Sequence, residues 1–69
     1  MVIKTDDSSS YEFFVEDGNV CFKQGSTEGI VTELSGLKIG EHLTIKYYPL
    51  DAKQSFPSMV ITPCITEII

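Results

Sequence analysis

The segment "YEFFVEDGNVCF", residues 11–22, places a turn sequence between two runs of β-branched and aromatic residues. Residues 17–19 (Asp-Gly-Asn) are of the types that adopt positive φ most readily, as the tightest hairpin turns require. Ser9 and Glu12 have the spacing of a helix capping box, but the Phe-Phe-Val run that follows has poor helix propensity. We therefore predict a β-hairpin here, with an antiparallel sheet around it.

Two later segments show the period-2 alternation of half-buried strands. In residues 28–34, one face would carry Ile30, Thr32 and Leu34. In residues 43–48, the apolar face would carry Leu43, Ile45 and Tyr47, and the opposite face Thr44, Lys46 and Tyr48. A Pro-containing loop at residues 49–58 follows, and residues 59–69 then provide one or two closing strands interrupted at Pro63, which has no amide hydrogen to donate.

The short opening segment "MVIK" is followed at residues 5–10 by a polar stretch, "TDDSSS", that we expect to be a turn or a loosely ordered arm. Gly36 and Gly40 bracket three residues and predict a corner between consecutive strands. Five or six short strands without a convincing helix indicate an all-β fold, with residues 1–69 as a single domain. We predict a small antiparallel barrel or rolled sheet of five to six strands, SH3-like or OB-like.

The charge of the chain narrows the classes of partner. Ten acidic residues face five lysines, arginine is absent, and the net charge is −5. Nucleic-acid binders gain much of their affinity from Lys and Arg contacts with phosphates, so nucleic acid is disfavoured as a partner, and anionic membranes are disfavoured for the same reason.

The sequence also predicts the cellular compartment of the protein. It contains neither an apolar run of membrane-spanning length nor the apolar stretch of a signal peptide, so we expect a cytoplasmic protein. In that compartment we expect Cys21 and Cys64 to be reduced thiols.

The residues of catalytic, metal and cofactor sites do not form a recognisable pattern in this sequence. His42 has no Cys or Ser near it in a recognised catalytic frame. The acidic residues lack the spacing of a calcium loop, there is no Cys-x-x-Cys pair, and the glycines fit no phosphate-binding motif. We therefore predict a protein that is not an enzyme, with no metal and no cofactor.

An acidic patch with an aromatic centre is the main candidate site. If Tyr11, Phe13 and Val15 face the core, the alternation leaves three residues on the outer face: Glu12, Phe14 and Glu16. An exposed aromatic ring between two carboxylates would anchor a basic partner. The alternative is that a loop covers Phe14, or that a bulge turns it to the other side.

Two further surfaces are candidates. Lys46 and Tyr48 share the outward face of their strand, where a ring and an ammonium group would contact a partner. The apolar C-terminus, residues 63–69, would be an edge open to strand addition from a second copy or another protein if nothing covered it.

These features favour a small non-catalytic protein-interaction domain, as a monomer or a homodimer, binding through the acidic patch or by strand addition. One alternative is a nucleic-acid-binding module in which Tyr11, Tyr47 or Tyr48 stacks on bases. Another is an acidic inhibitor that mimics nucleic acid and blocks the basic groove of an enzyme.

Overall fold

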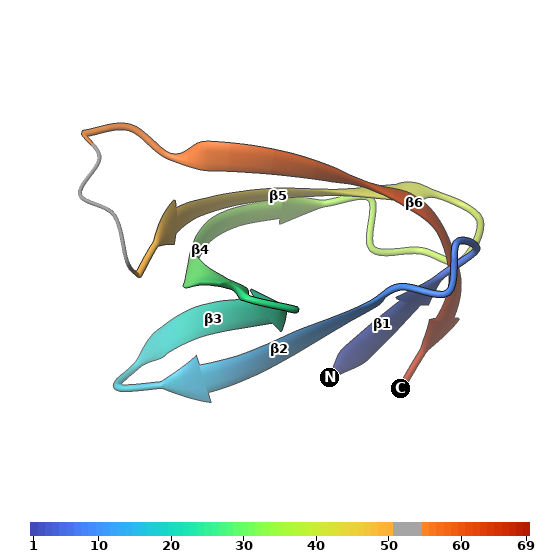
Figure 1. The fold of residues 1–69 in the computed structure, drawn as a ribbon, viewed down its shortest axis with the longest axis horizontal. Helices are drawn as coiled ribbons and strands as arrows, with labels where there is room; N and C mark the ends of the chain where they lie inside the picture. Colours follow the sequence, from blue (N-terminus) through green and yellow to red (C-terminus); the bar gives the residue numbers. More distant parts are fainter. Residues whose placement is uncertain (51–54) are drawn as a thin grey trace.

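The computed structural model describes residues 1–50 and 55–69, which form a closed antiparallel barrel of six strands and no helix (Figure 1). The strands are β1 (Val2–Thr5), β2 (Ser10–Glu16), β3 (Asn19–Gln24), β4 (Thr27–Ser35), β5 (His42–Pro49) and β6 (Ser58–Ile68). The predicted small all-β barrel is confirmed. Part of the predicted loop at residues 49–58, residues 51–54, lies outside the described residues.

The strand order is an up-and-down meander. Each strand hydrogen-bonds to its neighbours in sequence, and β6 pairs with β1 to close the circle. Figure 1 shows the result: both termini lie at the same end of the molecule, where β1 runs beside the last part of β6. The opening segment of the sequence is therefore a full member of the barrel.

Tight turns follow the predicted chemistry. In the hairpin of β2 and β3, Glu16 pairs with Asn19, and the two turn residues Asp17 and Gly18 have φ values of 51° and 78°. Positive φ at both positions is the type I′ geometry that suits the twist of the flanking strands, so the predicted hairpin is confirmed. Gly36 opens the corner between β4 and β5 at φ 85°, where a Cβ atom would collide with the carbonyl oxygen of His42.

A register shift in β4 changes which of its side chains face the core. The pairing with β5 slips by one residue between Val31 and Glu33, which leaves Thr32 as the extra residue of a bulge. Val31 and Leu34 both pack against the core, whereas Ile30 belongs to the outer face. The prediction that Ile30, Thr32 and Leu34 share one face is therefore wrong, because a bulge breaks the period-2 alternation.

The core is formed by apolar side chains from five strands, with Phe22 of β3 near its centre. Its buried members are Ile3, Tyr11, Phe13, Phe22, Leu43, Ile45, Tyr47 and Ile65. Phe22 stacks on Phe13 at a centroid distance of 6.1 Å and meets Tyr47 edge-on at 4.6 Å. Val15 points to the same side as Phe13 but is 73% exposed, because it lies near the end of β2.

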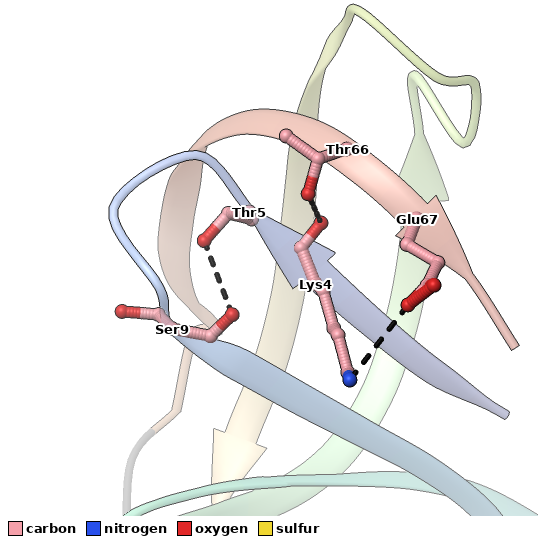
Figure 2. Close-up of polar contacts among 5 residues, drawn as sticks. All are labelled: Lys4, Thr5, Ser9, Thr66 and Glu67. Atoms are coloured by element: carbon pink, nitrogen blue, oxygen red, sulfur yellow. Dashed lines mark hydrogen bonds and ion pairs between the residues drawn. The ribbon is translucent and has the colours of Figure 1, made fainter.

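Pairing of β1 with β6 closes the barrel. The Val2 and Ile69 backbones exchange two hydrogen bonds of 2.9 and 2.8 Å. Figure 2 shows the side chains along this seam: the Thr66 hydroxyl donates to the Lys4 carbonyl at 3.3 Å, and Lys4 Nζ lies 3.7 Å from a Glu67 carboxylate oxygen. The C-terminal segment is thus taken up by pairing within the chain, which removes the basis of the strand-addition hypothesis.

The turn between β1 and β2 is ordered by Asp7. Its Oδ1 accepts a hydrogen bond of 2.6 Å from the Thr5 hydroxyl and one of 3.0 Å from the Ser9 amide. The Thr5 hydroxyl also lies 3.3 Å from the Ser9 carbonyl oxygen, as drawn in Figure 2. Hydrogen bonds from Thr5 and Ser9 favour the charged form and lower the pKa of Asp7 below its ordinary 3.8. The polar stretch at residues 5–10 is therefore a defined turn.

Replacing Ile3 by Ala tests whether β1 is part of the folded barrel. Ile3 is completely buried, so the substitution should lower the free energy of unfolding by about 2–5 kcal/mol. The same substitution at Ile61, which is 61% exposed on β6, is the matched control and should change stability by less than about 0.5 kcal/mol. Urea denaturation followed by circular dichroism measures both; equal effects would mean that β1 does not pack in the barrel.

Asp7 should make stability depend on pH. A carboxylate whose pKa is lowered by folding stabilises the native state above its unfolded value of 3.8, and that contribution is lost as the pH falls through the folded pKa. Asp7→Ala should therefore lower the melting temperature at about pH 7, and the difference from wild type should shrink as the pH falls below 3.8.

Thermal unfolding at a series of pH values measures this difference. Asp6→Ala removes the adjacent carboxylate and keeps both Asp7 hydrogen bonds, so it serves as the control. A gap between wild type and Asp7→Ala that stays constant down to the lowest pH would contradict the assigned role.

Candidate interaction surface

Cross-strand register aligns four outward residues in one row across β2, β3, β4 and β5. Phe14 pairs with Cys21, Cys21 with Ile30, and Ile30 with Tyr48. The neighbouring Phe13 of β2 points into the core, so this row lies on the outer face. Directly paired residues have their Cβ atoms about 4.5–5.5 Å apart, so the four side chains form a continuous apolar row.

Burial of Cys21 shows how closely this row is packed. The Cys21 side chain belongs to the outer face, yet the residue is only 4% exposed. Its two cross-strand neighbours, Phe14 and Ile30, lie on either side of it and are half-buried. Phe14 is therefore neither turned inward nor fully exposed: it lies opposite Cys21 on the outer face and is half-buried.

Carboxylates surround the row. On one side, Lys23 of β3 pairs with Glu12 of β2 and with Glu28 of β4. On the other side, Glu16 pairs with Asn19. These positions on β2, β3 and β4 carry three acids, one lysine and one asparagine, so the surface beside the row is net negative on these strands.

The chemistry of Cys21 reflects these surroundings. Burial raises the pKa of its thiol, and the nearby negative charges of Glu16, Glu28 and Asp17 raise it further. A thiol with a raised pKa stays protonated, so Cys21 acts here as a small apolar residue and not as a nucleophile.

Lys46 lies two residues before Tyr48 on the outward face of β5, as the alternation predicts. Its Nζ atom is 3.0 Å from a Glu33 carboxylate oxygen, and Lys46 lies opposite Met59 of β6. The ion pair lies on the surface, with the Lys46 side chain 45% exposed, so Lys46 as well as half-buried Tyr48 can contact a partner.

The structure joins what the sequence presented as two surfaces. Glu12, Phe14 and Glu16 lie on β2, and Lys46 and Tyr48 lie on β5, with β3 and β4 between them. The connecting residues, Cys21 and Ile30, were missed. Alternation predicts which face a residue occupies within one strand, but it does not specify which residues of neighbouring strands lie opposite each other.

The tyrosines differ in their availability for base stacking. Tyr11 and Tyr47 are 7% and 8% exposed and belong to the core. Tyr48 is half-buried on the outer face, next to Ile30. Two of the three candidate stacking residues are therefore used in packing.

A second cluster of reactive side chains lies between β5 and β6. His42 Nε2 is 3.5 Å from Cys64 Sγ, and His42 Nδ1 is 2.7 Å from the Thr62 carbonyl oxygen. Cys64 is 22 positions away from His42 in the sequence, so this pair could not be predicted, and only strand pairing brings the two together.

Within residues 1–50 and 55–69 there is no pocket, no group of three or more potential metal ligands, and no helix long and apolar enough to cross a membrane. The apolar row across β2–β5 and its flanking charges form the candidate site. Comparison with family models, curated proteins and solved structures gives no match for this chain.

Proposed function

We propose that this chain is a non-catalytic protein-interaction domain that binds a basic partner through an acidic-apolar surface. This surface comprises the apolar row of Phe14, Cys21, Ile30 and Tyr48, and its flanking residues Glu12, Glu16, Lys23 and Glu28. The observation that carries the proposal is the register that aligns these residues across four strands.

A small barrel does not need apolar residues on its outer face in order to fold. The outward residues of an antiparallel sheet are ordinarily polar, because one face packs on the core and the other meets water. Phe14, Ile30 and Tyr48 are half-buried, so part of each residue remains exposed and can contact a partner. Aromatic residues that are already partly ordered make good interface anchors, since little side-chain entropy is lost on binding.

The flanking charges indicate the kind of partner. Carboxylates around an apolar centre match a surface that offers Lys or Arg around an apolar or aromatic group. The same carboxylates repel phosphates, so they support a protein partner over nucleic acid. Lys23 and the Glu33–Lys46 ion pair interrupt the acidic surface, which argues against mimicry of a phosphate backbone.

We place this activity in the cytoplasm. Cys21 and Cys64 are unpaired, which supports a reducing compartment. In this proposal the partner is another protein with a basic surface. The alternative partner, a second copy of the chain, has a net charge of −5 and would have to bind through the apolar row alone.

The test compares proteins captured from a lysate by the wild-type chain and by a variant with Glu12→Lys, Phe14→Ala and Glu16→Lys. The variant removes the aromatic anchor and reverses two charges, so partners with a basic surface should be lost. Light scattering on both chains tests self-association. If the wild-type chain forms a dimer and the variant is a monomer, the second copy binds at this surface.

A matched control separates local from overall charge. Asp6→Lys with Glu41→Lys reverses two exposed acids away from the row and gives the same net charge as the two Glu→Lys changes. This control should retain the partners. An identical set of partners for all three chains would remove the acidic-apolar surface from consideration.

A further inference from the structure

His42 and Cys64 lie opposite each other, although the regular register of β5 and β6 would place Pro63 opposite His42. A register shift inserts one extra residue into β6 at this point. Thr62, which is buried, stabilises the shift: its hydroxyl accepts a hydrogen bond of 3.0 Å from the Leu43 amide and donates one of 2.8 Å to the Pro63 carbonyl. The backbone and the core thus hold the two side chains together.

The partners of His42 determine its tautomer. A carbonyl oxygen can only accept a hydrogen bond, so Nδ1, at 2.7 Å from the Thr62 carbonyl, carries the ring proton. In the neutral ring Nε2 then has a free lone pair, and the Cys64 thiol at 3.5 Å donates to it. The Cys64 thiol, the His42 ring and the Thr62 carbonyl thus supply a nucleophile, a base and a group that orients the base.

We propose that Cys64 is a thiol-modification site at which His42 acts as the base, and that its reaction partner is a small cationic disulfide. His42 is exposed and Cys64 is half-buried, so a small molecule can reach the sulfur.

In the reaction, Nε2 takes the thiol proton and Cys64 Sγ attacks one sulfur of the disulfide. A new S–S bond forms as the old one breaks, and the leaving thiolate takes the proton from the imidazolium. Cys64 is oxidised to a mixed disulfide, and one thiol is released.

The neighbouring charges favour a cationic reagent. The Asp6 amide donates to the Cys64 carbonyl at 3.0 Å, and the Glu41 carbonyl accepts a hydrogen bond from the Ile65 amide at 2.9 Å. These backbone contacts place Asp6 and Glu41 in the segments next to Cys64 and Ile65. The Glu41 amide also donates to the Lys38 carbonyl at 3.1 Å, so one lysine lies in the same corner, in a chain whose net charge is −5. An anionic disulfide would be repelled on approach, whereas a cationic one is attracted.

The first experiment uses cystamine as the disulfide and the two cysteines of the wild-type chain as each other's control. Cleavage after lysine separates them into peptides 5–23 and 54–69, so mass spectrometry follows both in one sample. Cys64 should be modified at least about tenfold faster than Cys21, which is buried and has a raised pKa. The difference should disappear in urea; equal rates in the folded chain would overturn the proposal.

The second experiment tests His42 itself. His42→Asn keeps an amide that can donate to the Thr62 carbonyl but removes the base, and should slow modification of Cys64 by about tenfold or more. Thr44→Asn, the same replacement at the next outward position of β5, should leave the rate unchanged. An unchanged rate in His42→Asn, or an equal loss in both variants, would contradict the role of His42 as the base.

Discussion

Closure of the barrel through β1 is the constraint on which the rest of the structure depends. This strand has only four residues, yet it must pair with both β2 and β6. The three register shifts lie in β4 and β6, the two longest strands, and these bulges let a long strand bend around the barrel. Closure then separates the side chains into an inner set that forms the core and an outer set that meets solvent.

Both candidate sites depend on the register between neighbouring strands. The apolar row is continuous because β2, β3, β4 and β5 lie side by side, with their outward residues in direct register. The His42–Cys64 pair exists because one of the bulges moves Cys64 into the position that Pro63 would otherwise occupy. The two sites differ in chemistry: the thiol in the row is buried and protonated, whereas the thiol of the pair is hydrogen-bonded to a base.

Local chemistry made much of the fold predictable from the sequence. The Asp-Gly turn requires positive φ, which identified the hairpin, and alternation correctly placed Tyr11, Phe13, Leu43, Ile45 and Tyr47 in the core. Alternation failed in β4, because an extra residue reverses the side that Leu34 faces. Pairings between distant segments were also out of reach: the outward direction of Phe14 and Tyr48 followed from local pattern, but their connection through Cys21 and Ile30 depends on register.

Amide NMR spectra of the ¹⁵N-labelled chain would show whether the outer face of β2–β5 binds a basic partner, as we propose. The spectra would be recorded while the partner captured by the wild-type chain is added. The account predicts shifts at residues 12–16, 19–23, 28–30 and 46–48, with β1 and residues 65–68 of β6 little changed. Shifts concentrated on β1, on that part of β6 or on the corner at residues 36–41 would contradict it.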